Sequence, residues 1–187
     1  MVEVALLLER AGAALAPVPL RDTLICARTL AMADDFHKGL VAEGARGRMI
    51  LASACDEAGN AWQTPVMQAR RDDVGGWRLD GERSAVAWGM EAQTILISAW
   101  IESHDCAGLF LVPADAPGLH RQAQVGTDPT PLAILTLTDV RLPANALLDG
   151  GAGPADLLRW HVGQMRVGLA ASQLGIAGEA LRRTAAY

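Results

Sequence analysis

The spacing of apolar residues divides the chain into two helical flanks and a central region of short strands. Apolar side chains recur every three to four positions over Val2–Leu15 and Leu20–Gly39, which is the spacing of amphipathic helices. Pro17 and Pro19 end the first helix, because proline lacks the amide hydrogen that the next helical turn needs. Asp22 suits the first turn of the second helix. The pattern therefore predicts an N-terminal helical hairpin.

From Gly47 onward the pattern changes to alternation, or to short apolar runs bounded by turn residues, as in β-strands. Turns such as Asp72–Gly76 and Asp115–Gly118 separate these runs. No helix-length segment lies between them, which favours an antiparallel sandwich or barrel over βαβ units. The candidate strands are Met49–Cys55, Thr64–Arg70, Trp77–Leu79, Thr94–Ile101, Leu109–Val112 and Ile134–Val140.

Gly150–Pro154 is a linker that returns the chain to helix, and the helical pattern then continues to Tyr187. Small residues three or four positions apart on this helix allow a neighbouring helix to approach closely, so we expect it to be buried against other helices. The small residues are Gly168, Ala171, Gly175 and Gly178.

Both outer helices reach the chain ends without capping residues, so we expect the central piece of a larger α–β–α protein, truncated at both ends. The predicted fold class is α+β. Its expected units are residues 1–44, the end of an N-terminal helical domain; residues 45–150, an antiparallel β-barrel or sandwich domain; and residues 151–187, the first helix of a C-terminal helical bundle.

Composition narrows the function classes. The chain is 51% hydrophobic and 20% charged, which excludes a disordered protein. The net charge of −5, with a single lysine and no basic run, argues against a nucleic-acid partner. The cysteines at positions 26, 55 and 106 are widely spaced and odd in number, which favours the cytoplasm over a disulfide-forming compartment. The most apolar stretch, Val162–Leu181, contains Gln164, Arg166, Gln173 and Glu179, which make a membrane span too costly.

Five segments carry turn and packing patterns in a characteristic order. They are Leu8–Leu20, Gly76–Arg83, Leu109–Leu119, Leu135–Pro143 and Arg166–Leu181. In this order they resemble the acyl-CoA dehydrogenase family of flavoenzymes, over about the central half of a full-length member. The resemblance implies the cofactor FAD, an acyl-CoA substrate, a role in fatty acid and lipid metabolism, and a homo- or hetero-oligomer with another acyl-CoA dehydrogenase subunit.

In the family's reaction a base and the flavin have separate roles. A glutamate removes the α-proton of the acyl-CoA thioester while a hydride passes from the β-carbon to flavin N5. That glutamate usually lies in the C-terminal bundle, beyond Tyr187, as does an arginine-x-x-x-glutamine-phenylalanine-glycine stretch that contacts FAD from a neighbouring subunit. The resemblance therefore assigns no catalytic residue to this chain.

The segment Cys55-Asp56-Glu57 occupies the position of the family's threonine-glutamate-proline-glycine loop, which meets the flavin. The resemblance therefore implies cofactor-binding roles for these three residues, and an acidic side chain facing flavin N3 can accept a hydrogen bond. Trp62 stands where the family has a serine that helps to hold the thioester. The alternative interpretation is an acidic turn between two strands.

A second flavin-contacting segment is implied at Ser84–Gly89, where the family has tryptophan-isoleucine-threonine-asparagine-glycine. The resemblance assigns cofactor contacts to Val86 and Ala87. Ala85 and Ala87 replace the tryptophan and threonine, which removes stacking area and a hydrogen bond. Trp88 substitutes only if the strand register slips, and a slip of one residue would turn it to the opposite face. An ordinary strand without a flavin is the alternative.

Arg166 aligns with an arginine near the family's acyl-CoA pocket, which implies a substrate-binding role; a structural salt bridge is the alternative. The histidines at positions 37, 104, 120 and 161 share no metal-like spacing, so no metal site is predicted and structural or solvated roles are expected.

Three functional hypotheses follow. The chain represents an FAD-dependent acyl-CoA dehydrogenase, a catalytically silent partner subunit in a heteromeric dehydrogenase, or a β-barrel binding module without a redox role. The departures from the family pattern at Asp56, Trp62, Ala85 and Ala87 favour the second.

Overall fold

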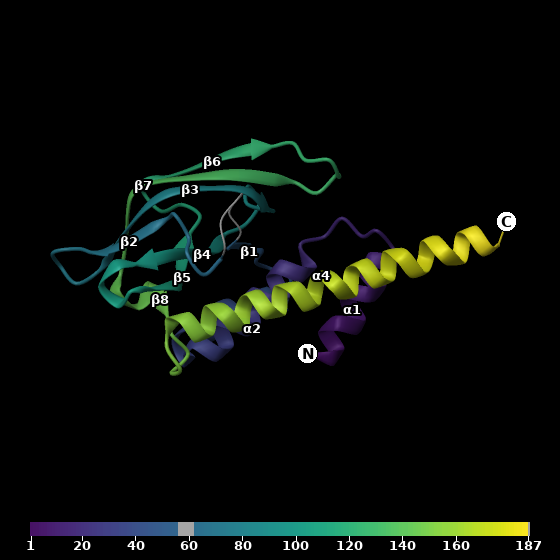
Figure 1. Ribbon diagram of the computed structural model, residues 1–187, viewed down its shortest axis with the longest axis horizontal. Coiled ribbons are helices and arrows are strands. Elements are labelled where there is room, and N and C mark those ends of the chain that lie inside the picture. The colour runs from purple at the N-terminus through teal and green to yellow at the C-terminus, as the bar shows by residue number, and fades with distance from the viewer. Residues whose placement is uncertain (56–61, 187) are drawn as a thin grey trace.

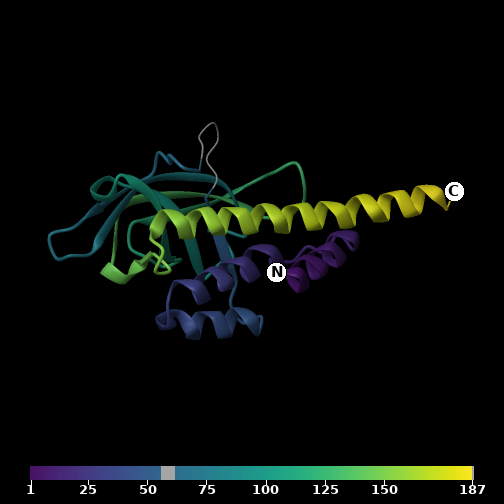
Figure 2. The same cartoon turned by 60° about the horizontal axis from the view of Figure 1, so that its bottom comes forward.

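The computed structural model describes residues 1–55 and 62–186, with the side chain of residue 35 also outside the description. Within these residues an eight-stranded, mostly antiparallel sheet lies beside a layer of helices (Figures 1 and 2). This arrangement confirms the predicted α+β fold class.

The helices are α1 (Val2–Ala13), α2 (Leu20–Ala33), α3 (Lys38–Ala45) and α4 (Pro154–Ala185), with short 3-10 turns at η1 (Asp35–His37), η2 (Glu102–His104) and η3 (Ala144–Ala146). The strands are β1 (Leu51–Ala54), β2 (Gln68–Arg71), β3 (Trp77–Ala87), β4 (Thr94–Ile101), β5 (Cys106–Pro113), β6 (Leu119–Gln124), β7 (Leu132–Leu142) and β8 (Leu147–Leu148).

The sheet has the strand order β6-β7-β3-β2-β4-β5-β8, and β1 pairs with β4 outside this path. The β4 pairings with β1 and β2 are parallel, whereas the long β3–β7 and β4–β5 pairings are antiparallel. Strand β4 has the bounds predicted from the sequence. Strand β6 was not predicted, because this edge strand carries polar residues such as Arg121 and buries little apolar surface.

The core of the sheet is built around Trp77, which is fully buried as the sequence predicted. Its ring packs edge-on against Phe110 at 5.3 Å between centroids, and its indole Nε1 donates to the carbonyl of Ala144 at 3.2 Å. The polar end of the ring is thereby satisfied inside an apolar cluster. This ring joins two strands to the segment that leads into β8.

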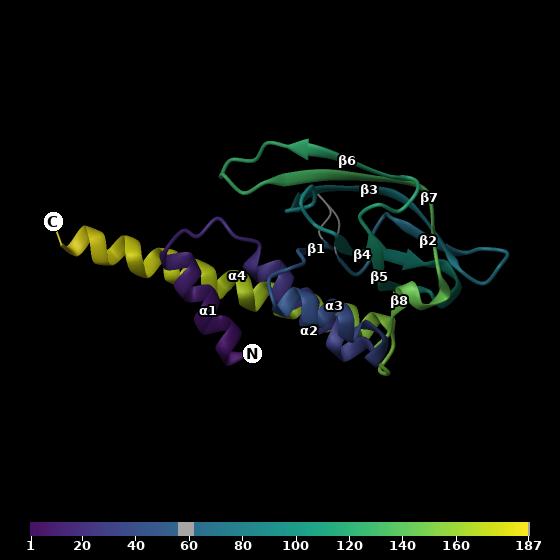
Figure 3. The same cartoon turned by 180° about the vertical axis from the view of Figure 1, so that it is seen from behind.

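The helix predicted over Leu20–Gly39 is interrupted. Asp34 has an extended backbone, and its carboxylate accepts a hydrogen bond from the Phe36 amide at 2.8 Å. Such local side-chain bonding competes with the helical ladder, so α2 ends at Ala33 and the chain reverses into α3. The close hairpin is therefore formed by α2 and α3 (Figure 2), whereas α1 packs along α4 (Figure 3).

The crossing of α1 and α4 depends on glycine. A Cβ atom on Gly12 would lie 2.9 Å from the carbonyl carbon of Ser172, and one on Gly175 would lie 2.8 Å from the backbone nitrogen of Ala13. The small residues of α4 therefore allow close helix packing, as predicted. On other faces α4 is exposed, as at Leu181, and its C-terminal part extends beyond the sheet (Figure 1).

None of the helices in the described part of the chain has the length and apolar character that crossing a membrane requires.

Candidate functional site

Two adjoining cavities lie where the helices meet one end of the sheet, and both are lined by Arg21, Asp22 and Ala87. The larger has a volume of about 430 Å³ and the smaller about 120 Å³. Only the larger falls within the roughly 300–1,000 Å³ typical of small-molecule sites. The helices α2 and α4 contribute to both cavities.

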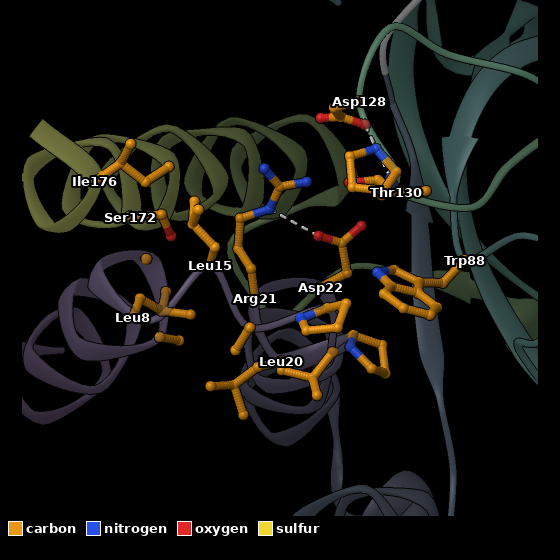
Figure 4. A pocket seen from close by; sticks show the side chains of 18 residues that line it. Leu8, Leu15, Leu20, Arg21, Asp22, Trp88, Asp128, Thr130, Ser172 and Ile176 are labelled. Atoms are coloured by element: carbon orange, nitrogen blue, oxygen red, sulfur yellow. Dashed lines mark hydrogen bonds and ion pairs between the residues drawn. The ribbon is translucent and has the colours of Figure 1, made fainter. Parts of the chain in front are cut away.

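The larger cavity is mostly apolar and draws on both layers of the fold (Figure 4). Leu8 and Leu15 come from α1 and the turn after it, while Ser172 and Ile176 come from α4. The sheet supplies Trp88 and the β6–β7 loop. The full lining is Leu8, Ala11, Gly12, Leu15, Ala16, Pro17, Val18, Pro19, Leu20, Arg21, Asp22, Ala87, Trp88, Asp128, Pro129, Thr130, Ser172 and Ile176.

An ion pair lies at the boundary between the cavities. The Arg21 Nε donates to the Asp22 Oδ1 at 2.7 Å, and Asp22 is only 3% exposed (Figure 4). Its place in the first turn of α2 was predicted, and the positive end of the helix dipole favours a carboxylate there. Sequence analysis did not predict that this pair faces a cavity, because only the folded chain brings the α1–α2 turn beside Trp88.

The smaller cavity brings together three of the predicted site residues from separate elements. Cys55 follows β1, Ala87 ends β3, and Arg166 lies on α4. Val86 does not line it, because this side chain is 3% exposed and lies in the sheet core. Asp56 and Glu57 lie outside the described residues. The cofactor and substrate roles of these residues stay predictions.

The end of β3 is irregular. The β3–β7 register shifts between Arg83 and Val86, and Ala85 between them has a left-handed φ of 56°. The Ala85 amide donates to the Gln124 side chain at 2.7 Å. Trp88, at φ 59°, donates its amide to the carbonyl of Pro131 at 2.8 Å. The irregularity places Trp88 at the larger cavity and not at the smaller one.

Trp62, predicted at the thioester position, lies at a different place. It is partly buried against the core between the helices and the sheet. It also lines a third cavity of about 390 Å³, together with Trp100, Cys106 and Arg159. The structure thus separates Trp62 from the cavity that contains Cys55 and Ala87.

Behind the smaller cavity, the fully buried His161 joins α4 to both neighbouring layers. Its Nδ1 lies 2.7 Å from the Thr29 hydroxyl on α2, and its Nε2 lies 2.8 Å from the Ser53 hydroxyl on β1. Thr29 already donates to the carbonyl of Ile25 at 2.9 Å, so it accepts from Nδ1–H and Nε2 accepts from Ser53. Burial lowers the pKa of His161 to about 4, which keeps the ring neutral.

Comparison with known proteins shows which proteins this chain is similar to. No family model matches the chain. Acyl-CoA dehydrogenase FadE27 from Mycobacterium tuberculosis is 30% identical over 179 residues, which are 94% of this chain and 45% of the relative. The resemblance to the acyl-CoA dehydrogenase family is confirmed. The chain spans about half the length of the relatives that it matches.

Solved structures of acyl-CoA dehydrogenases share the arrangement. The ChsE4–ChsE5 complex from Mycobacterium tuberculosis has a TM-score of 0.88 and 29% identity, covering 99% of this chain and 49% of that chain. A variant of the Tcur3481–Tcur3483 steroid ACAD has a TM-score of 0.88 and 37% identity, with coverages of 98% and 48%. A glutaryl-CoA dehydrogenase from Mycobacterium smegmatis in complex with FADH2 has a TM-score of 0.78 and 25% identity, with coverages of 92% and 45%.

Three of the expected flavin positions, Ala85, Val86 and Ala87, do not fit an isoalloxazine ring. The smaller cavity, at about 120 Å³, is below the size of typical ligand sites. Ala85 and Ala87 have no polar side chains, and the Ala85 amide is engaged by Gln124. Val86 is enclosed in the sheet core. Ala85, Val86 and Ala87 therefore offer a flavin neither a stacking surface nor a side-chain hydrogen bond.

Proposed function

We propose that this chain acts in a heteromeric acyl-CoA dehydrogenase, in which an acyl-CoA thioester is dehydrogenated between its α- and β-carbons and the hydride passes to FAD. The chain contributes the wall of an acyl pocket, and a partner acyl-CoA dehydrogenase subunit supplies the main flavin contacts. The observation that carries this proposal is the poor fit of Ala85, Val86 and Ala87 to a flavin beside a ligand-sized cavity lined by Trp88.

The related structures support a heteromeric assembly. The ChsE4–ChsE5 complex and the Tcur3481–Tcur3483 enzyme each carry the names of two proteins, and both have a TM-score of 0.88 to this chain. On this proposal residues 1–44, 45–150 and 151–187 correspond to the end of an N-terminal helical domain, the β-domain and the first helix of a C-terminal bundle.

Arg166 is the proposed contact to the thioester substrate. It is exposed at the mouth of the smaller cavity, and no residue among 1–55 and 62–186 forms a hydrogen bond or ion pair with it. A guanidinium group that the described residues leave unpaired is available to a ligand oxygen.

The first experiment measures flavin content. The chain is co-expressed with a flavin-bearing acyl-CoA dehydrogenase subunit from its own genome, and the purified complex is analysed for FAD and for both polypeptides. We expect FAD in proportion to the partner subunit alone, and dehydrogenation of acyl-CoA with an artificial electron acceptor. Stoichiometric FAD on this chain purified by itself would contradict the division of roles.

The second experiment tests Arg166 in the same complex. Arg166→Gln should raise KM for the acyl-CoA substrate about tenfold, because a hydrogen bond from a charged group is lost. Arg159→Gln is the matched control on the same helix, since Arg159 forms an exposed pair with Asp156 outside the smaller cavity. Equal KM values for the two variants would remove Arg166 from the substrate site.

A further inference from the structure

A serine and a histidine at the smaller cavity have the geometry of a nucleophile and its base. The Ser53 Oγ lies 2.8 Å from the His161 Nε2, and the serine hydroxyl donates to that nitrogen. The other ring nitrogen, Nδ1, donates its hydrogen to the Thr29 hydroxyl at 2.7 Å. A nucleophile at about 2.6–3.2 Å from a base, with the base oriented by a third group, is the arrangement by which enzymes activate a hydroxyl.

The His161 ring is in the state that a general base requires. Burial lowers the pKa of His161 to about 4, so the Nε2 keeps its lone pair at neutral pH. Thr29 donates its own hydrogen to the carbonyl of Ile25 at 2.9 Å, which fixes the ring hydrogen on Nδ1. A base of such low pKa is weak, so we expect its reaction to be slow.

The Ser53 hydroxyl can be reached from the cavity. Ser53 is partly exposed and lines the smaller cavity, whereas His161 is fully buried behind it. The volume of about 120 Å³ is several times that of a water molecule and accepts the carbonyl end of an ester. Arg166 lines the same cavity, and its cationic group would stabilise the negative charge that develops on a carbonyl oxygen under attack.

We propose that Ser53 is a nucleophile, with His161 as its general base, for acyl transfer from a short ester or thioester. The Ser53 Oγ bonds to the acyl carbonyl carbon and gives its proton to the His161 Nε2. The bond from that carbon to the leaving oxygen or sulfur breaks, and the leaving group takes the proton from Nε2. Thr29 is a positioning residue, because it holds the ring through Nδ1.

Water completes the reaction. It gives one proton to the His161 Nε2 while its oxygen bonds to the carbonyl carbon of the acyl-serine. The Ser53 Oγ then leaves and recovers the proton. The products are a carboxylic acid and an alcohol or thiol, so no electrons are exchanged and no oxidant is needed. This activity goes beyond the proposed function, since it requires neither flavin nor a partner subunit.

The test uses the purified chain with p-nitrophenyl acetate and with the corresponding thioester, S-(4-nitrophenyl) thioacetate. Absorbance follows release of the nitrophenyl group, and mass spectrometry of peptides locates the acetyl group, which we expect on Ser53. Ser53→Ala should remove this acetylation, and His161→Gln should slow it about a hundredfold. Ser103→Ala is the matched control and should leave the rate unchanged, because Ser103 lies 2.9 Å from a His104 ring nitrogen at an exposed turn away from the cavity.

Labelling of the unmodified chain keeps the test decisive if a variant does not fold. Phenylmethylsulfonyl fluoride should modify Ser53 at least about tenfold faster in the folded chain than in urea, because only folding brings the base to the hydroxyl. Acetylation of Ser53 by either acetyl reagent supports the proposal, and the faster reagent identifies the preferred leaving group.

Three results would overturn the proposal. The first is acetylation of Cys55, whose Sγ lies 3.5 Å from the Ser53 Oγ, in place of Ser53. The second is an unchanged rate in folded Ser53→Ala, and the third is equal labelling of Ser53 in the folded and unfolded chain. None of these reagents needs FAD or an electron acceptor, so the outcomes are independent of the dehydrogenase tests.

Discussion

The close contact between α1 and α4 predicts how much a single added methyl group changes the stability of the protein. In Gly175→Ala, the added Cβ would lie 2.8 Å from both the Ala13 nitrogen and the Glu9 carbonyl carbon. Both atoms are backbone, so no side-chain rotation can relieve the overlap, and the two helices must separate. Gly178→Ala is the matched control, because a Cβ at Gly178 meets no atom within 4 Å.

The expected magnitudes follow from two opposing terms. Alanine is better than glycine in a helix by about 1 kcal/mol, which is the expected gain in unfolding free energy for Gly178→Ala. In Gly175→Ala the free energy of unfolding has the same gain but is also lowered by overpacking. This cost is roughly 1–3 kcal/mol, and we expect a value near the upper limit because the added atom overlaps backbone. The two variants should therefore differ by about 2–3 kcal/mol. Separation of the helices would also expose Leu8, which is 2% exposed.

The assay is urea unfolding followed by far-ultraviolet circular dichroism, with hydrogen exchange of the α1 amides as a second measurement. Gly175→Ala should lower the unfolding midpoint and increase exchange in α1, whereas Gly178→Ala should raise the midpoint. If Gly175→Ala is as stable as Gly178→Ala and its α1 amides stay protected, then the close backbone approach between these helices is not present in solution.

Three further predictions concern the buried polar bridge and the core. The pKa of His161 is 6.5 in the unfolded chain and about 4 in the folded one. Between these pH values the unfolded state binds one more proton than the folded state. The free energy of unfolding should therefore fall as pH drops from 6.5 through 4, by up to about 3 kcal/mol. His161→Gln should abolish this component of the pH dependence, whereas His120→Gln, at an exposed position, should retain it. If the two variants have identical profiles of unfolding free energy against pH, the lowered pKa of His161 is refuted. Ser53→Ala should lower the free energy of unfolding by about 1–3 kcal/mol, because it leaves the His161 Nε2 buried without its donor. Ser103→Ala, on an exposed turn, is the control, and equal urea midpoints for the two variants would argue against the hydrogen bond between Ser53 and His161. Trp77→Ala should lower the free energy of unfolding, measured with urea, by about 3–5 kcal/mol. A smaller decrease than that of Trp88→Ala would contradict the central position of Trp77 in the core.

Parts of the site were predictable because their signals are local. The strand over Thr94–Ile101 is a mostly apolar run, and a strand of this kind is buried on both faces. The segments containing Cys55 and Ala87 were placed by their order along the chain, and the structure brings them to one cavity with Arg166. Sequence order alone does not show that Val86 points into the core, because the register shift before it decides which side chains face the cavity.

The residues missed by sequence analysis lack a local signal. Arg21 and Asp22 resemble any charged pair in a first helical turn, and only the arrangement of α2 with α4 and the β6–β7 loop places them at a cavity. His161 has no distinctive spacing, yet it joins Thr29 and Ser53, which are far from it in sequence. Such interactions arise only when distant elements pack together.

The amino-acid sequence by itself determined the class of this protein: helical flanks around a β-domain, a small-residue helix suited to close packing, and segment order typical of acyl-CoA dehydrogenases. These properties depend on periodicity and turn chemistry, which act over a few residues. Tertiary structure alone decided that α1 packs on α4, that Trp88 turns toward the larger cavity, and that Arg21 and Asp22 lie at its boundary. The reason is physical: the shape and charge of a cavity depend on which distant surfaces meet, and no local pattern encodes that meeting.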